Sequence, residues 1–284
     1  QNLLNLETGD SVNAFLRLRG GGLGDEEFVN SHYVVFATKN GTVKKTCLKE
    51  YSRPRANGVK ALIISEGDEV VDVRLTNGSN ELIIADRNGR AVRFDEDQVR
   101  TSGRAAMGVR GMMLDDDDDA VVGMIVVNDA EKETAMVVSE NGYGKRSEIG
   151  EYRKTSRAKK GVKTIAVTEK TGKLVAIKNV IDENDLMIIN KSGIVIRMAV
   201  ANVRVMGRAT QGVRLINLAK KNDTIASVCK VMSSELEATV EEESRQKWNE
   251  TNEKLQQDIV SQTPESTGDD APEAMDTDDN NKTE

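Results

Sequence analysis

The residues best suited to chemistry are lysines and arginines that flank a repeated Gly-Val pair. The pair recurs at gaps of 50, 53 and 51 residues, and each time a basic loop precedes it and a cation follows it. Cations repeated at one place in a periodic array form a stripe that can bind the phosphates of a polyanion, although a single such cation can also serve to protect an edge strand. The loop cations are Arg53, Arg55, Arg100, Arg104, Arg153, Lys154, Arg157, Lys159, Lys160, Arg204 and Arg208, and the cations after the pair are Lys60, Arg110, Lys163 and Arg214.

Groups that would support catalysis or hold a cofactor are scarce. The chain has one histidine and two cysteines, and the cysteines form no Cys-x-x-Cys motif, so zinc ribbons and disulfide scaffolds are excluded. Tyr51 and Tyr152 occupy equivalent repeat positions, which favours packing over nucleophilic chemistry. The acidic run 115–119 could chelate a cation, but the equivalent turns of other repeats favour a solvated hairpin tip. We therefore expect no catalytic residue, no metal and no cofactor in this segment.

The repeat itself predicts the architecture. A second marker, Asn-Gly or Ser-Gly at 40, 88, 141 and 192, recurs at gaps of 48, 53 and 51 residues in register with the first. In the second copy an apolar run (81–86), a turn at Asn88-Gly89, and an alternating run (90–94) predict a hairpin with a primed turn. Two further apolar runs of the same copy, 109–114 and 120–125, complete a blade of four strands. The sequence thus predicts an all-β, propeller-like fold with almost no helix before residue 233.

The net charge of −7 conceals two regions of opposite sign. Residues 233–284 carry 16 acidic and 4 basic side chains, a balance of −12, which leaves +5 on residues 1–232. This tail is poor in apolar residues, so we expect it to be mostly disordered, with a short helix possible over 235–257. No apolar stretch approaches the 18 or so residues of a membrane span, so no membrane partner is expected.

Three segments resemble the carboxy-terminal domain family of the bacterial DNA gyrase A subunits. They are Asn-Gly-Thr-Val-Lys-Lys-Thr at 40–46, Asn-Gly-Tyr-Gly-Lys-Arg at 141–146 with the following Glu151-Tyr152, and Gly-Arg-Ala-Thr-Gln-Gly-Val at 207–213. The resemblance covers residues 1 to about 232, and the acidic tail is similar to that family's variable tail. It implies a β-pinwheel, in which neighbouring propeller-like blades exchange strands and a basic perimeter wraps duplex DNA.

The resemblance also implies a function for the whole assembly. Wrapping in one sense would give direction to ATP-dependent negative supercoiling by DNA gyrase, a cytoplasmic enzyme associated with the bacterial chromosome. The family's catalytic tyrosine, metal ligands and ATPase site lie in other domains or in the partner protein. This segment alone is thus expected to be no enzyme, with ATP and Mg²⁺ used elsewhere. The expected partners, bound through missing domains, are a second A subunit together with the gyrase B subunit.

One departure concerns the family's marker heptapeptide, Gln-Arg-Arg-Gly-Gly-Lys-Gly, which is absent. Because the sequence begins at Gln1 and residues 1–18 match only half a unit, we expect the heptapeptide to lie upstream. The related A subunit of topoisomerase IV, whose domain lacks the heptapeptide, stays an alternative. A non-enzymatic propeller scaffold that binds an acidic protein partner is a second alternative.

The expected organisation is a partial blade at 1–18 and blades at about 31–76, 80–127, 133–180 and 184–232, followed by the tail at 233–284. From charge alone, we hypothesise that the tail competes with DNA for the basic rim, that is, for the stripe of repeated loop cations. The predicted DNA-binding residues are the cations given above together with cations on the second strand of each hairpin, namely Lys44, Lys45, Arg93, Lys145, Arg146 and Arg197.

Overall fold

The computed structural model describes Gly9, residues 11–18, 22–53, Arg55, and residues 57–218 and 223–232. The chain divides into two compact units, Gln1–Ser233 and Ser234–Glu284, and every described residue belongs to the first. The predicted acidic tail and its possible helix therefore lie outside the described residues. Within the described part, no helix is long and apolar enough to cross a bilayer.

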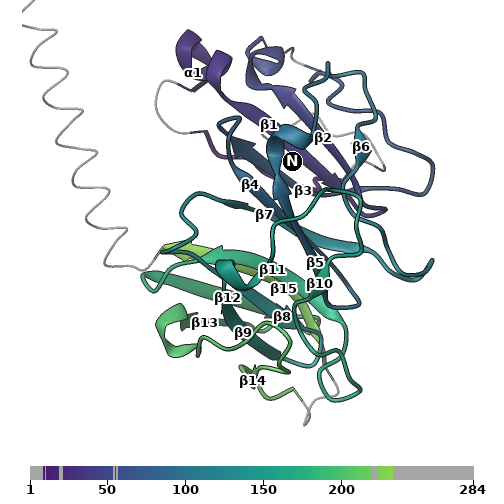
Figure 1. Cartoon of the computed structure of the whole chain (residues 1–284). Helices are drawn as coiled ribbons and strands as arrows, with labels where there is room; N and C mark the ends of the chain where they lie inside the picture. Colours follow the sequence, from purple (N-terminus) through teal and green to yellow (C-terminus); the bar gives the residue numbers. More distant parts are fainter. Residues whose placement is uncertain are drawn as a thin grey trace, which may run out of the picture. The chain divides into compact units, whose positions relative to one another are not determined.

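Four antiparallel sheets follow one another along the described chain, as the colours of Figure 1 show, and this arrangement confirms the predicted all-β, propeller-like fold. The first sheet has the order β3 (Val70–Thr76), β1 (Tyr33–Thr38), β2 (Thr42–Cys47), β6 (Val109–Arg110). The second has the order β10 (Val162–Lys163), β5 (Arg90–Asp95), β4 (Glu81–Asp86), β7 (Val121–Val127). The third has the order β11 (Leu174–Val180), β8 (Thr134–Ser139), β9 (Tyr143–Glu148), β14 (Val213–Arg214).

The short outer strands show that neighbouring blades exchange strands. β6 belongs to the second repeat but pairs with β2 of the first, β10 of the third repeat pairs with β5, and β14 of the fourth pairs with β9. Each of these three blades is thus completed by the Gly-Val segment of the next repeat. Reading the run 109–114 as a strand of its own repeat's blade was therefore wrong, because its two paired residues lie on the preceding blade.

The fourth sheet has three strands rather than the predicted four. Its order is β13 (Val195–Ala199), β12 (Asn184–Asn190), β15 (Ile225–Met232). No later repeat within the described residues supplies the short outer strand. Val195 at this edge accordingly remains 49% exposed, whereas the equivalent Val43 in the first sheet is fully buried.

The hairpin turns differ from the predicted primed type. Gly89 has a φ of 79°, and its amide donates to the carbonyl of Asp86, so three residues separate β4 from β5. Ala158 is the only non-glycine residue with positive φ among the described residues, so Asn88 does not adopt the left-handed region that a primed turn requires. The Asp86 carboxylate instead accepts a hydrogen bond from the Arg90 backbone amide at 2.8 Å, which closes the loop.

Apolar side chains fill the spaces between successive sheets. Because side chains alternate along a strand, Leu82 and Ile84 of β4 pack against the first sheet, while Ile83 and Ala85 pack against the third. A third cluster joins the third and fourth sheets, and a fourth covers the outer face of the first sheet. Burial on both faces explains why the first strand of each of the first three hairpins, β1, β4 and β8, is a nearly continuous apolar run.

Helical structure in the described part is confined to short elements, as predicted. Its single α-helix, α1 (Glu26–Ser31), begins where the Asp25 carboxylate accepts the Phe28 amide at 3.0 Å. Each hairpin is followed or preceded by 3-10 turns, which are η1 (Gly22–Gly24), η2 (Leu48–Tyr51), η3 (Glu96–Gln98), η4 (Ile149–Glu151) and η5 (Val200–Asn202). The basic loops leave from the last four of these turns, so the turns set where each loop begins.

Candidate nucleic-acid interface

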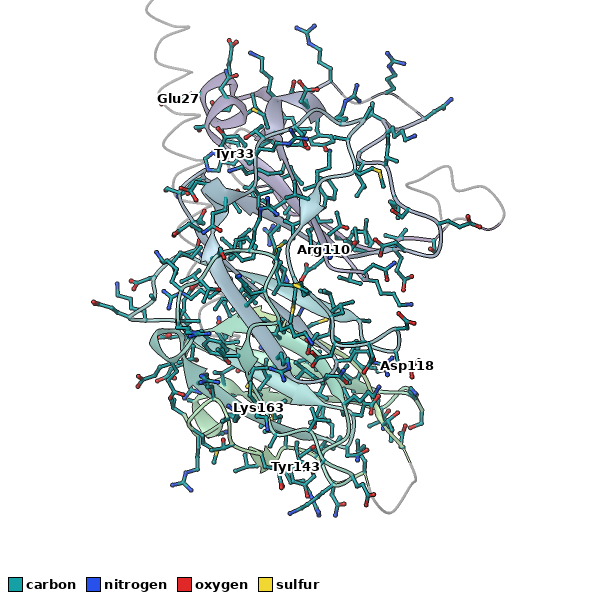
Figure 2. All side chains as sticks on the ribbon, turned by 45° about the vertical axis from the view of Figure 1, so that its right-hand side comes forward. Glu27, Tyr33, Arg110, Asp118, Tyr143 and Lys163 are labelled. Atoms are coloured by element: carbon teal, nitrogen blue, oxygen red, sulfur yellow. The ribbon has the colours of Figure 1, made fainter. Side chains whose placement is uncertain are left out.

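The interface is built on the three exchanged strands β6, β10 and β14, called the donated strands below. Each of them turns a valine inward and a cation outward. On the first blade, Val109 pairs with Val43 and Arg110 with Thr42. Lys163 on β10 and Arg214 on β14 hold the same place on the next two blades (Figure 2 labels Arg110 and Lys163). All three cations are exposed, whereas each valine is half-buried. The repeat thus places one outward cation per exchanged strand.

Glycine permits the close approach of the donated segment. Gly161 has a φ of 75°, and a Cβ on it would lie 2.2 Å from the carbonyl oxygen of Ala91. Gly108 and Gly212 have the same left-handed conformation and would meet the carbonyl oxygens of Val43 at 2.5 Å and Gly144 at 2.6 Å. Only a residue without a side chain fits at these points. The Gly-Val marker therefore records the strand exchange itself.

Most of the predicted DNA-binding cations are exposed. A subset forms no hydrogen bond or ion pair through its side chain to any other described residue, and these groups are free to meet a ligand. They are Arg53, Arg55, Lys60, Arg100, Arg110, Arg153, Lys159, Lys163 and Arg204. Arg214 is also exposed, and its guanidinium donates to the Tyr143 hydroxyl at 2.8 Å.

Three further exposed cations are held by carboxylates. Lys154 lies 2.6 Å from Glu81 and 2.8 Å from Asp95, Lys160 lies 2.8 Å from Asp115, and Arg197 lies 2.7 Å from Asp185. Exposed pairs of this kind contribute about 0–1 kcal/mol, so a polyanion can compete for these cations. We therefore keep these three cations within the candidate interface, because each could leave its carboxylate partner for a phosphate.

Four predicted DNA-binding residues lie in the interior, and we therefore correct their assignment. Lys44, Lys45, Lys145 and Arg146 are between 0% and 6% exposed. Lys44 Nζ donates to Thr46 Oγ1 at 2.6 Å and to the Ala61 carbonyl at 2.7 Å. Side chains so enclosed and so bonded have no phosphate within reach, and we assign them to the packing between blades.

The lysine at the first of these positions alternates with apolar residues from blade to blade. In the first and third blades Lys44 and Lys145 pair with the hydroxyls of Thr46 and Ser147, the latter pair at 2.7 Å. In the second and fourth blades the same positions hold Val92 with Phe94 and Ile196 with Met198. Burial lowers the pKa of Lys44 and of Lys145 to about 8, with Glu50 and Glu151 respectively opposing the shift.

Stability should therefore rise with pH where Lys145 loses its proton only in the folded state. The unfolded chain keeps that proton up to its ordinary pKa of 10.5, so between about pH 8 and 10 the unfolded state binds more protons and unfolding becomes less favourable. Lys145→Met should reduce this rise but not abolish it, because Lys44 still titrates in the same range. Urea unfolding at pH 7.5 and 9.5 measures the rise. Lys163→Met, an exposed control, should leave the rise intact, and an unchanged profile in Lys145→Met would refute the assignment.

The other two interior cations bind the 3-10 turn of the following repeat or the residue directly after that turn. Lys45 Nζ donates to the Glu96 carbonyl at 2.9 Å, and Arg146 Nε donates to the Val203 carbonyl at 2.9 Å. Arg93, at the same strand position and half-buried, donates to the Ile149 carbonyl at 2.8 Å. These predicted DNA contacts thus serve to dock one repeat on the next.

The remaining three predicted residues, Arg104, Arg157 and Arg208, are half-buried in the basic loops. The guanidinium groups of Arg157 and Arg208 donate to backbone carbonyls of the preceding repeat. The Arg104 guanidinium lies 3.9 Å from the Glu50 carboxylate. Sequence reasoning identified these loops but not this division between outward and inward cations.

The acidic turn and Tyr152 engage their side chains in contacts within the fold. Asp115 accepts from Arg90 at 2.9 Å and pairs with Lys160, Asp119 is buried, and the intervening 116–118 are exposed. No cluster of metal-ligating side chains occurs among the described residues. Burial raises the pKa of Tyr152 to about 12, which disfavours its nucleophilic form.

The fold defines a class, a propeller-like repeat domain in which neighbouring blades exchange short strands that each carry an outward cation. The family model described as "DNA gyrase C-terminal domain, beta-propeller" matches residues 32–77, 80–128, 133–181 and 184–229. These ranges cover more than half of the chain, and the chain belongs to this family.

Individual relatives agree with this membership. The DNA gyrase A subunit of Staphylococcus aureus (strain MRSA252) is 36% identical over 263 residues, which span 93% of this chain and 29% of that protein. Its counterpart from strain NCTC 8325 is 38% identical over 242 residues, spanning 85% of this chain and 26% of that protein. The chain thus spans less than a third of the length of these curated relatives.

Solved structures agree in fold. The C-terminal domain of DNA topoisomerase IV matches with a TM-score of 0.69 and 28% identity, covering 77% of this chain and 69% of that one. The DNA gyrase A C-terminal domain matches with a TM-score of 0.64 and 24% identity, covering 72% of this chain and 67% of that one.

Proposed function

We propose that this chain binds duplex DNA along its exposed loop cations and wraps it as part of a DNA gyrase. The observation that supports this most directly is the recurrence of outward cations at one place in each exchanged strand, at Arg110, Lys163 and Arg214. Regularly spaced cations suit a ligand with regularly spaced phosphates. Contacts through the backbone would give little base specificity.

Wrapping requires bending, and the number of exposed cations supports it. Bending a short duplex costs on the order of a few kcal/mol, which several phosphate contacts can offset. Wrapping in one sense would then make strand passage directional, so that the holoenzyme introduces negative supercoils. Its ATP and Mg²⁺ would be used outside this chain. Its partners on the bacterial chromosome would be a second A subunit together with the gyrase B subunit.

Affinity for a short duplex at increasing salt tests the binding proposal. If six to ten cations neutralise phosphates, the logarithm of the association constant should fall with the logarithm of salt concentration with a slope of roughly −5 to −9. An acidic protein partner lacks the condensed counterions of DNA. A shallow slope, with tighter binding to an acidic peptide than to the duplex, would favour the scaffold alternative.

One observation favours the topoisomerase IV alternative. That structure is the more similar in fold of the two compared above, with a TM-score of 0.69 against 0.64. The curated gyrase relatives, at 36–38% identity, favour gyrase. A holoenzyme that relaxes and decatenates DNA without introducing negative supercoils would decide for topoisomerase IV.

Removing the acidic tail should strengthen DNA binding. The tail's charge of −12 opposes the +5 of the remainder, so residues 233–284 can compete with DNA for the cations. We expect a chain ending at Met232 to bind a duplex several-fold more tightly at about 50 mM salt, with the difference shrinking as the Debye length shortens. Equal affinities and equal salt slopes for the two chains would refute this hypothesis.

A further inference from the structure

Two half-buried arginines connect the basic loops to one another. Arg157 donates from Nε to the Gln98 carbonyl at 3.0 Å and from Nη1 to the Arg110 carbonyl at 2.8 Å. Arg208, one repeat later, donates from Nε to the Glu151 carbonyl at 3.1 Å and from Nη1 to the Lys163 carbonyl at 2.6 Å. Each guanidinium therefore joins the 3-10 turn and the donated strand of the preceding repeat.

The backbone reinforces the same connection at regular intervals. The Met113 amide donates to the Lys159 carbonyl at 3.1 Å, and the Ala166 amide donates to the Thr210 carbonyl at 3.1 Å. The Arg157 and Arg208 amides also donate to the side chains of Gln98 and Glu151, at 2.9 and 2.6 Å. Successive loops thus form one hydrogen-bonded series rather than independent surface segments.

The residues held in this way are the ones that present outward cations. Arg110 and Lys163 stand on strands of only two residues, whose ladders are too short to fix them firmly. Each has its carbonyl bound by the arginine of the next loop while its own side chain points into solvent. A guanidinium suits this role because its planar fork can donate to two carbonyls in a fixed geometry.

We propose that Arg157 and Arg208 are positioning residues for DNA wrapping. They hold Arg110 and Lys163 at fixed directions along the rim and make no phosphate contact of their own. The spacing of the outward cations, and hence the curvature imposed on a bound duplex, depends on these two forks. This inference rests on the proposed function, which supplies the duplex.

Arg104, the equivalent arginine of the second repeat, lacks the hydrogen bonds that Arg157 and Arg208 form. The Arg104 side chain forms no hydrogen bond to a backbone carbonyl within the described ranges, and only its 3.9 Å pair with Glu50 connects it to the preceding repeat. A single exposed ion pair is weak and fixes no direction. The positioning role therefore belongs to Arg157 and Arg208 and does not extend to Arg104.

Lysine and glutamine substitutions separate geometry from charge. Arg157→Lys keeps the charge but cannot form the fork, whereas Arg157→Gln loses both. Arg17 lies outside the basic loops, is exposed and has no side-chain partner among the described residues, so Arg17→Lys and Arg17→Gln are controls of the same residue type. The readouts are hydrogen exchange of residues 109–114 without DNA, and the linking-number change of a nicked plasmid ligated with saturating protein.

We expect Arg157→Lys to raise amide exchange over 109–114 roughly tenfold, as for a lost hydrogen-bonded tether, and to reduce the linking-number change at least twofold. Arg157→Gln should match it. Arg17→Lys and Arg17→Gln should leave both readouts unchanged, because Arg17 belongs neither to the basic loops nor to the exchanged strands. Arg110→Gln should have a smaller additional effect in the Arg157→Lys background than in the wild type.

The inference is overturned if Arg157→Lys matches the wild type in exchange and in linking-number change, since the charge alone would then suffice. It is also overturned if the rise in exchange and the loss of linking-number change are only as large as the variant's lost thermal stability accounts for at the assay temperature. Failure of the proposed function is distinct, because the wild type would then bind no duplex, while the exchange experiment would still report whether the fork holds residues 109–114.

Discussion

Replacing Arg110, Lys163 and Arg214 together by glutamine should reduce duplex affinity more than any other three-residue change. Each neutralised phosphate contributes roughly 0.9 to the slope of log affinity against log salt, so the slope should become shallower by roughly 2.7. At about 0.1 M salt we expect affinity to fall on the order of a hundredfold. Fluorescence anisotropy of a labelled duplex over a salt series measures both quantities.

A charge-matched variant controls for the overall field of the protein. Lys39, Lys132 and Lys191 are exposed and lie in turns that are not part of the basic loops or the exchanged strands, and glutamine at all three changes the net charge equally. This control should lose only a small part of the affinity and little of the slope. If both triple variants lost the same affinity, binding would depend on net charge alone, and the outward cations of the exchanged strands would have no special role.

Gly161→Ala should disrupt the exchange between the second and third repeats. The added Cβ would meet the Ala91 carbonyl oxygen at 2.2 Å, and alanine disfavours the φ of 75°. Strain in the left-handed region and the steric conflict with backbone together should lower the free energy of unfolding by roughly 2–5 kcal/mol. Urea unfolding, followed by circular dichroism, measures the loss.

The first repeat offers a control at the same position. Gly58 has a φ of 72°, but a Cβ on it would meet nothing within 4 Å. Gly58→Ala therefore introduces the conformational strain without the conflict and should cost only about 1–2 kcal/mol. Equal losses in the two variants would mean that the close approach at Ala91 contributes nothing to stability.

The repeat and its strands were predictable because they have two strong local signals. Positions such as Gly58, Gly108, Gly161 and Gly212 recur in register with the hairpin glycines, and the apolar runs between them have the length of strands. The turn type was not predictable, because Asn-Gly suits both a primed turn and a three-residue loop. Only the backbone distinguishes them, through the Gly89 amide bound to Asp86.

Strand exchange and the three-stranded last sheet depend on neighbouring repeats. A two-residue strand such as β6 has no periodicity of its own, so its pairing with β2 depends on how the repeats pack. The sequence could not indicate it without the resemblance to a known family. The exposed edge of β13 follows from the same rule, since its missing neighbour would come from another repeat.

The buried lysines were misassigned because their charge was considered without the face of the strand on which they lie. Lys44 and Thr46 are two residues apart on one strand and thus share a face, and Lys145 and Ser147 repeat this pattern. A lysine and a hydroxyl on the face that carries apolar side chains in the next blade indicate a buried polar pair. That comparison was available in the sequence and would have removed these residues from the interface.

Chiral wrapping is the central claim, and the linking number of DNA tests it most directly. A nicked plasmid would be ligated in the presence of increasing amounts of the 284-residue chain, and its topoisomers resolved after the protein is removed. We predict a shift of one sign that grows with protein and disappears at high salt. Tight binding of the plasmid without any shift in linking number would contradict chiral wrapping.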